Sequence, residues 1–285
     1  MANPAIPTCK SLETFVSYYG DLEMTLIVSF RTMDGIVIAG DSLSTLSAEL
    51  KPVLEQEVTC PECEHVQVVT TTIEQPLSFT ASTFTYAQKV FPFLGKFGVG
   101  TFGAGQVANK TMHFAIRELE ASLKKNKGGY TKVSAVAKKI GEYVHELLKQ
   151  SVPGWQDAPE EWVLVGFQVV GYEESEARTI VVLVGKEVHF ETHEHFGITI
   201  NGVLDVVSAI GNLYESNQII KPQYHLFSLQ DAIEYAKFMI HTTAQYQQFA
   251  NTIPNVGGDI DIGLTTPFDG FKWIQQKPLS RLIGQ

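Results

Sequence analysis

The sequence predicts a mixed α+β protein in which two antiparallel sheets lie between layers of helices. Three observations support this prediction. Apolar runs rich in Val and Ile occur in pairs joined by short turn signals, as the strands of hairpins do. Two stretches with helical spacing follow one another without a strand between them. Strands and helices do not alternate one by one, as they would in a parallel sheet.

The first strand pair covers residues 25–42. Two apolar runs flank Met33-Asp34-Gly35, a typical break between the strands of a hairpin. Folding the chain there with equal arms places Thr25 across from Asp41 and Ser42, because cross-strand partners lie about 5 Å apart. We therefore expect Thr25 and Asp41 to be neighbours at the open end of the hairpin.

A segment at about 46–84 separates this hairpin from the next strand pair. It holds Cys60-Pro61-Glu62-Cys63 and a Thr-rich run, and we interpret it as an insertion. Strands are expected again at Thr85–Phe91 and Phe97–Phe102, joined by a turn at Gly95-Lys96.

Two helices are expected next. The first begins after Gly103-Ala104-Gly105 and runs to about Lys124, because Lys127-Gly128-Gly129 breaks the pattern. Thr131 is expected to cap the second, which runs to about Val152. The apolar residues at helical spacing are Ala115, Ile116, Leu119 and Leu123 in the first helix, and Val133, Val136, Ile140, Val144, Leu147 and Leu148 in the second.

The second half of the chain contains further signals for strands and for a helix. Ser228 and Asp231 form a capping-box pattern, with Asp in place of Glu, that opens a long helix ending near Phe249. Gly257-Gly258 precedes the last strand pair. The runs that predict strands are Trp162–Tyr172, Thr179–Val184, Val188–Phe190, Ile260–Thr265 and Phe271–Ile274.

The composition favours one compact domain at 25–285. The chain has 285 residues, of which 44% are hydrophobic and 18% are charged, which is enough for one large core. A net charge of −10 without a basic stripe argues against nucleic acid as a partner. No apolar run approaches the roughly 20 residues that span a bilayer, so no membrane partner is expected.

Residues 1–24 are interpreted as a leader or propeptide. They lack the apolar core of a signal peptide, and Asp21 and Glu23 stand where a small-residue cleavage site would be. The chain has three cysteines, and the Cys-x-x-Cys pair is no disulfide framework. A cytoplasmic protein is therefore expected.

Thr25, Asp41 and a lysine form a plausible catalytic group if the chain begins at Thr25. A threonine hydroxyl is a weak nucleophile and needs an adjacent base. An α-amine, with a pKa of about 7.7–8.0, can be that base at neutral pH. A lysine beside the hydroxyl stabilises its deprotonated form, and an aspartate keeps the lysine charged and oriented. The candidate lysine is Lys89, in Gln88-Lys89-Val90.

These features resemble the opening of a proteasome β-subunit. The similar residues are the hairpin with Thr25 and Asp41, the Lys89-Val90 pair, and the small-residue turn Gly98–Gly105. The resemblance implies the fold of the N-terminal-nucleophile (Ntn) hydrolases, a four-layer αββα sandwich. It also implies that Thr25 is the nucleophile and that Asp41 and Lys89 are its catalytic partners.

The resemblance assigns further roles around the nucleophile. A backbone N–H of the turn, from Gly103 or Ala104, forms the oxyanion hole, because small residues let the substrate approach the backbone. Thr45 falls where the family has a threonine whose backbone pairs with the extended substrate.

The implied function is that of a proteasome-like threonine peptidase. Such an enzyme hydrolyses peptide bonds of peptides or unfolded proteins inside closed rings of identical subunits, and it uses no cofactor. Whether an unfoldase is a further partner stays open. A second hypothesis is an Ntn hydrolase of small non-peptide amides. A third is a catalytically silent ring or scaffold subunit.

The silent-subunit hypothesis rests on two positions near the end of the chain. Val256 stands where the family has a serine, and Ile253 stands where it has an aspartate. In the family these two residues support the threonine amine. Asn255 or Thr252 are the candidate substitutes in this chain.

The residue before the nucleophile also differs from the family pattern. Met24 stands where the family usually has glycine, which eases the tight turn of self-cleavage. Thr25 is exposed either by self-cleavage or by translation starting at Met24 with removal of the methionine.

Cys60 and Cys63, with His65, look like half of a zinc ribbon, whose tetrahedral site needs four ligands. Cys9 is the remaining thiol. Two interpretations stay open: zinc held between two subunits, with Cys60 and Cys63 from each, or a loop that binds no metal.

Overall fold

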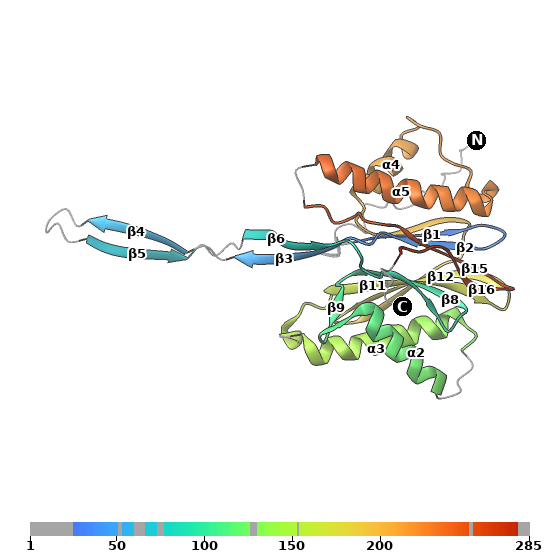
Figure 1. Ribbon diagram of the computed structural model, residues 1–285, viewed down its shortest axis with the longest axis horizontal. Helices are drawn as coiled ribbons and strands as arrows, with labels where there is room; N and C mark the ends of the chain where they lie inside the picture. The colour runs from blue at the N-terminus through green and yellow to red at the C-terminus, as the bar shows by residue number, and fades with distance from the viewer. Residues whose placement is uncertain are drawn as a thin grey trace, which may run out of the picture.

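The computed structural model describes residues 25–50, 53–59, 66–72, 77–125, 130–152, 154–250 and 253–278, with the backbone alone for 46–50, 53–59, 66–72 and 77–82. This part of the chain has a mixed α+β fold with several antiparallel sheets and four helices (Figure 1). No helix within it has the length and apolar character needed to cross a membrane.

The first five-stranded sheet has the order β14-β1-β2-β15-β16, and each neighbouring pair is antiparallel. Ile27 lies opposite Gly40 in the β1–β2 hairpin. Continuing this register places Thr25 opposite Ser42, beside Asp41, as the sequence predicts. The strands are β1 (Leu26–Arg31), β2 (Ile36–Gly40), β14 (Gly197–Gly202), β15 (Asp261–Thr266) and β16 (Gly270–Gln275).

The second five-stranded sheet has the order β13-β12-β11-β8-β7 and is also antiparallel. Val90 lies opposite Gly100 where β7 begins. The strands are β7 (Val90–Phe93), β8 (Phe97–Gly103), β11 (Val163–Glu173), β12 (Glu176–Gly185) and β13 (Val188–His193).

Helices cover the outer faces of the two sheets (Figure 1). Apolar side chains of α2 and α3 form one core cluster with the second sheet, and those of α5 form another with the first sheet. Between the sheets, Ile27 and Ile38 pack with Phe102 and Val170. The helices are α2 (Met112–Lys125), α3 (Val133–Ser151), α4 (Asp205–Glu215) and α5 (Leu229–Phe249), with short 3₁₀ turns at η1 (Trp155–Asp157) and η2 (Tyr224–Leu226).

The predicted insertion contributes two more strand pairs. β3 (Ser44–Leu50) pairs with β6 (Leu77–Phe84), and β4 (Val53–Thr59) pairs with β5 (Val66–Thr72). In Figure 1 these pairs extend away from the two five-stranded sheets. Because both pairs are antiparallel, the chain returns to the end of β2 before it enters β7.

Two expectations about the chain that follows these strand pairs are wrong. The strand predicted at Thr85–Phe91 begins only at Val90. The first helix begins at Met112 rather than after Gly105, because a small hairpin of β9 (Gln106–Val107) and β10 (Lys110–Thr111) intervenes. The turn of this hairpin is at Ala108 and Asn109. Their positive φ values of 50° and 60° are not helical, so the helix begins only after the hairpin.

The N-cap of α3 is also different from the prediction. It is Lys132, not Thr131, and it makes no side-chain capping bond. By contrast, Ser228 and Asp231 form the predicted capping box at the start of α5. Strand β14 and helix α4 were not predicted, because both segments are short and lack a clear start or stop signal.

Candidate active site

Lys89 and Asp41 form a buried ion pair where the two large sheets meet. Asp41 directly follows β2 of the first sheet, and Lys89 directly precedes β7 of the second. Lys89 Nζ lies 3.0 Å from both Oδ1 and Oδ2 of Asp41, and it also donates to the carbonyl oxygen of Leu43. The side chains of Lys89 and Asp41 are 7% and 0% exposed. The structure thus brings together the two residues that the sequence assigned to one site.

Backbone N–H groups from separate segments hold the Asp41 carboxylate. Leu26 N–H donates to Oδ1 at 3.1 Å. Leu43 N–H and Gly257 N–H donate to Oδ2 at 3.1 and 3.0 Å. Since Leu26 follows Thr25, the carboxylate lies beside the start of β1. Thr25 is itself buried, and its carbonyl oxygen accepts the N–H of Val203 at 2.8 Å.

Burial lowers the pKa of Lys89, because the charged ammonium group loses hydration, and the charge and hydrogen bond of Asp41 act in the opposite direction. The lysine therefore holds its proton less tightly than an exposed lysine does. It can stabilise a negative charge that develops beside it while remaining oriented by Asp41.

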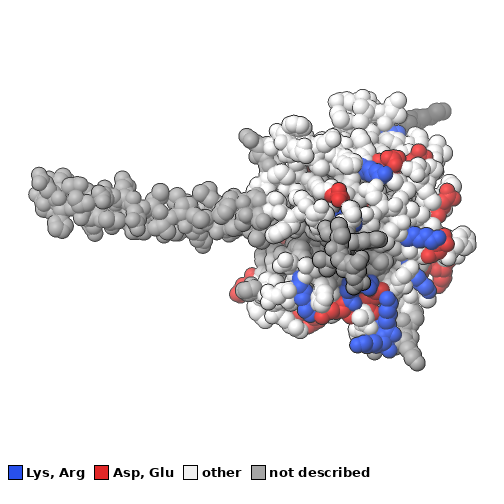
Figure 2. Space-filling model, in the orientation of Figure 1, with Lys and Arg blue, Asp and Glu red and all other residues white. Residues whose placement is uncertain are grey.

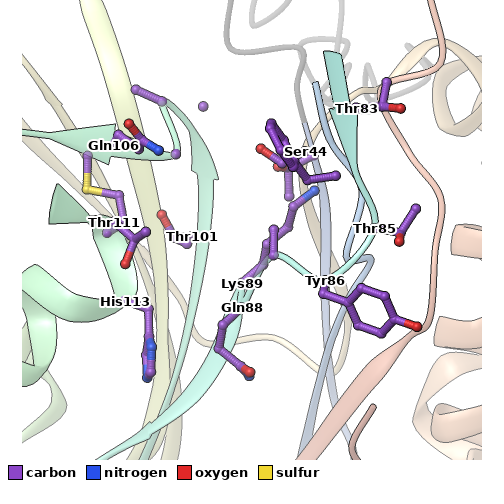
Figure 3. Close-up of a pocket in the computed structure, with 17 residues that line it drawn as sticks. Ser44, Thr83, Thr85, Tyr86, Gln88, Lys89, Thr101, Gln106, Thr111 and His113 are labelled. Carbon is purple, nitrogen blue, oxygen red and sulfur yellow. The ribbon is translucent and has the colours of Figure 1, made fainter. Parts of the chain in front are cut away.

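A cavity of about 690 Å³ lies beside the ion pair, within the range of about 300–1,000 Å³ that is typical of small-ligand pockets. In Figure 3, Lys89 and Gln88 stand between two walls. The wall from β8 to the start of α2 carries Thr101, Gln106, Thr111 and His113. The wall on the other side carries Ser44, Thr83, Thr85 and Tyr86. The remaining lining residues are Thr25, Phe84, Ala87, Gly103, Ala104, Gly105 and Met112.

Apart from Ser44 in β3, the second wall comes from the chain that returns from β6, at Thr83–Ala87. This segment is held to the first hairpin, because Ala87 N–H donates to the Ser42 carbonyl oxygen at 3.0 Å. The end of the predicted insertion therefore forms part of the pocket. The sequence alone gave no signal for this role, since residues 85–89 form no regular strand.

The two predicted oxyanion-hole donors differ in their backbone bonding. Ala104 N–H donates to the Leu164 carbonyl oxygen at 2.9 Å, so it faces β11. Thr101 N–H donates to the Lys89 carbonyl oxygen at 2.9 Å, on the opposite edge of β8. Because N–H groups alternate along a strand, Gly103 N–H is directed to the same edge as that of Thr101, toward Lys89. Gly103 also has a φ of 82°, which favours glycine.

Thr101 has a buried hydroxyl on the pocket wall that the sequence analysis did not single out. Thr101 is 6% exposed, and its Oγ1 has no hydrogen-bond partner among the described residues. A buried polar atom without a partner is unusual, and in a pocket it is available to a bound ligand. Threonine is common in apolar strands, so the sequence does not distinguish Thr101 as a residue of the pocket wall.

His113 lies on the same wall, at the start of α2. Burial is the main cause that lowers its pKa, and the positive charges of Arg117 and Lys277 act in the same direction. Burial thus favours the neutral form of His113. Among the described residues that line the cavity, none is Asp or Glu.

Thr45 and the loop around Gly257 support the site from the first sheet. Thr45 Oγ1 donates to the Pro254 carbonyl oxygen at 2.9 Å, and Thr45 lies opposite Thr83 in the β3–β6 pair. Ser42 N–H and Leu43 N–H both donate to the Gly257 carbonyl oxygen, at 3.0 and 2.8 Å. The loop after α5 is thereby held directly against the residues that flank Asp41.

The two positions that depart from the family pattern lie in this loop. Val256 is 2% exposed and packs in the core below α5. The N–H groups of Asn255 and Val256 both donate to Gln247 Oε1, at 2.8 and 3.0 Å. The loop contacts Asp41 through the backbone N–H of Gly257. Thr252 lies outside the described residues.

The candidate zinc ligands Cys60 and Cys63, with His65 and Cys9, also lie outside the described residues, as does the leader with Met24. Within the described ranges, no group of three or more His, Cys, Asp or Glu residues is placed to hold a metal ion.

Charged side chains of both signs are intermixed on the face that Figure 2 shows, without a basic stripe. Surface ion pairs of the described residues include Lys110 with Glu118 at 2.6 Å and Lys139 with Glu142 at 2.7 Å. No protein-family model matches the chain, and no curated protein matches it either. The geometry of the pocket is therefore the basis for assigning a function to the chain.

Proposed function

We propose that the chain is a proteasome-like threonine peptidase with Thr25 as an N-terminal nucleophile. The observation that carries the proposal is the buried contact between Lys89 and Asp41, at 3.0 Å, on the wall of a cavity that Thr25 also lines. A buried lysine beside a hydroxyl, fixed by an aspartate, is the arrangement that activates a weak nucleophile.

In the proposed reaction the chain has been opened before Thr25. The α-amine of Thr25 takes the proton of its own hydroxyl, and Oγ1 attacks the carbonyl carbon of a peptide bond. The amine then gives the proton to the departing nitrogen of the substrate, which leaves an acyl-enzyme. A water molecule, deprotonated by the same amine, hydrolyses the ester and restores the hydroxyl.

Lys89 and Gly103 stabilise the negative charges that develop in this reaction. The Lys89 ammonium stabilises the negative charge on Thr25 Oγ1 as the proton leaves, and Asp41 keeps the ammonium in place. Gly103 N–H is the better oxyanion donor of the two candidates, since the N–H of Ala104 is already used by Leu164.

The arrangement of layers supports the same family. Helices α4 and α5 cover the sheet that contains β1, and α2 and α3 cover the sheet that contains β8. We propose that this is the four-layer αββα sandwich of the Ntn hydrolases. In that arrangement the nucleophile begins a strand of one sheet and the lysine comes from the other, as Thr25 and Lys89 do here.

We also propose that the active form is a closed ring of identical subunits, located in the cytoplasm. A nucleophile that attacks accessible backbones is tolerated in a cell only if access to it is restricted. Closed rings need a heterologous interface on each subunit. The substrates would then be peptides or unfolded segments that can reach the inner chamber.

Intact mass and peptide hydrolysis test the proposal together. The purified protein is expected to contain a species that begins at Thr25 and cleaves fluorogenic peptides, whereas the Thr25→Ala variant does neither. A full-length species that remains stable in an assembled particle and cleaves nothing would instead support the silent-subunit hypothesis. Cleavage of small amides without cleavage of peptides would support the small-amide hydrolase.

A further inference from the structure

A second buried ion pair lies next to the first. Lys277 N–H donates to Asp261 Oδ1 at 2.8 Å, and Lys277 Nζ donates to Asp261 Oδ2. The side chains of Lys277 and Asp261 are 0% and 1% exposed. Asp261 begins β15, whereas Lys277 follows the end of β16. A buried ion pair is weak evidence for stability, because desolvation of both charges offsets their attraction. Stability alone is therefore not a sufficient reason for the Lys277–Asp261 ion pair.

Both segments of the catalytic ion pair contact this second pair. Asp261 lies opposite Gly40, the residue before Asp41. Gln88, the residue before Lys89, donates from Nε2 to Asp261 Oδ2 at 3.3 Å and to the Val90 carbonyl oxygen at 2.6 Å. Asp261 of the second pair therefore contacts the residue that precedes Asp41 and the residue that precedes Lys89.

The position of Lys89 in the chain explains why such a link matters. Lys89 comes just before β7, in residues 85–89, which are not part of a regular strand. The backbone bonds of this segment include those from Thr101 N–H to the Lys89 carbonyl oxygen and from Ala87 N–H to the Ser42 carbonyl oxygen, but they do not form the regular ladder of a strand. The Gln88 side chain adds a further attachment, because it joins the segment to β15 and to the start of β7.

The charge of Lys277 also acts on both walls of the pocket. It lowers the pKa of Lys89 and the pKa of His113, although burial is the larger cause at each. The ammonium of Lys277 is thus close enough to influence groups on either side of the cavity, although it does not line the cavity itself.

We propose that Asp261, Lys277 and Gln88 form a positioning unit that holds Lys89 against Asp41 and beside Thr25. Asp261 is the centre of the unit, because it accepts bonds from Lys277 and from Gln88. The inference rests on the proposed peptidase function, since Lys89 is assigned there as a catalytic residue. Lys277 and Asp261 act through Lys89 and are positioning residues.

The test compares peptide hydrolysis by the wild-type chain with that of four variants. Gln88→Leu breaks the link without changing an ion pair, and Lys277→Met removes the charge. Lys277→Arg keeps the charge. Lys272→Met is the matched control, because Lys272 is on the same hairpin and its exposed side chain pairs with Asp269 at 2.8 Å. The fraction of folded protein is measured for each variant by its thermal unfolding transition.

For Gln88→Leu and Lys277→Met we expect kcat to fall about tenfold or more, since small displacements of a catalytic group have large effects on rate. The KM of Lys277→Met should change by less than about twofold, because Lys277 does not line the cavity and ground-state binding is left intact. The acidic limb of the pH–rate profile should move to higher pH in Lys277→Met, since a nearby positive charge is removed. Lys277→Arg should restore most of the activity, and Lys272→Met should behave as the wild type.

Two results would overturn the inference. If Gln88→Leu and Lys277→Met fold and keep the wild-type kcat and pH profile, the unit does not position Lys89. If activity is lost only in proportion to the folded fraction, the second ion pair is structural. Failure of the proposed function looks different, because the wild type would then not hydrolyse peptides, or Thr25→Ala would hydrolyse them equally well.

Discussion

Lys89 and Asp41 are 48 residues apart in the sequence, yet Lys89 Nζ lies 3.0 Å from both carboxylate oxygens of Asp41. Asp41 ends the first hairpin in one sheet, and Lys89 introduces β7 in the other. The contact therefore joins the two sheets at the place where Thr25 begins β1. The predictions below follow from this junction and from the pocket beside it.

Replacing Thr25 by Ala is expected to reduce peptide hydrolysis to less than about one hundredth of the wild-type rate, because the nucleophile is lost. The fold should persist, with a change of about 1 kcal/mol in the free energy of unfolding. Steady-state hydrolysis and chemical denaturation are the measurements. Thr25→Ser, which keeps a hydroxyl, is the control and should stay measurably active. Residual activity of Thr25→Ala above one part in about a hundred contradicts the nucleophile assignment.

Asp41→Asn should be far more damaging to stability than a surface substitution. It leaves the buried charge of Lys89 without its counter-ion, which costs about 3–5 kcal/mol. Urea denaturation measures this loss, with Asp269→Asn in the exposed pair with Lys272 as the control. The control should change stability by less than about 1 kcal/mol. A similar effect in both variants would show that the Asp41–Lys89 contact is not formed in solution.

The burial of His113 predicts that the free energy of unfolding depends on pH. Burial lowers its pKa below the value of 6.5 that it has in the unfolded chain. Between these two values the unfolded chain binds more protons than the folded one, so stability decreases as the pH falls. Above pH 6.5 both states are neutral at His113 and no loss arises there.

The test of this pH dependence is the variant His113→Asn. Urea denaturation at about pH 7 and about pH 5 should show a smaller loss of stability on acidification in the variant than in the wild type. An equal loss in both proteins would mean that His113 is not buried in its neutral form.

Thr101→Val replaces an unpartnered buried hydroxyl by a methyl group of similar shape. The free energy of unfolding should stay the same or rise by about 1 kcal/mol, because a buried polar atom without a partner is unfavourable. Activity should persist. The ratio of kcat/KM for peptides with a hydrogen-bonding side chain over peptides with an apolar one should fall about tenfold or more, since the hydroxyl lines the pocket. Thr131→Val, at an exposed position that does not line this cavity, is the control. An unchanged ratio would exclude Thr101 from substrate contact.

Light scattering tests the proposed ring. A closed homo-oligomer is expected at micromolar concentration, with one defined mass and without larger open assemblies. A monomer that cleaves peptides would contradict a ring with a restricted chamber. The small-amide hydrolase would then be the better explanation of the pocket.

The sequence by itself determined the local elements of this protein. Val- and Ile-rich runs around Met33-Asp34-Gly35 specified the β1–β2 hairpin, and the equal arms fixed the register that places Thr25 beside Asp41. Helical spacing located α3, and Ser228 with Asp231 located the start of α5. These features depend on neighbours a few residues apart, so a local pattern is enough to predict them.

The tertiary structure decided what lies beside Thr25. Three features each join segments that are distant in the sequence. They are the contact of Lys89 with Asp41, the pocket wall formed by Thr83–Ala87, and the link from Gln88 to Asp261. The delayed start of α2 at Met112 likewise depends on the β9–β10 hairpin at the pocket. Such contacts form only when two sheets pack face to face, and packing depends on side chains whose spacing along the chain has no period. For that reason the place of Thr25 beside Asp41 was predictable from the sequence, whereas the contacts of Gln88 and Lys277 with Asp261 were not.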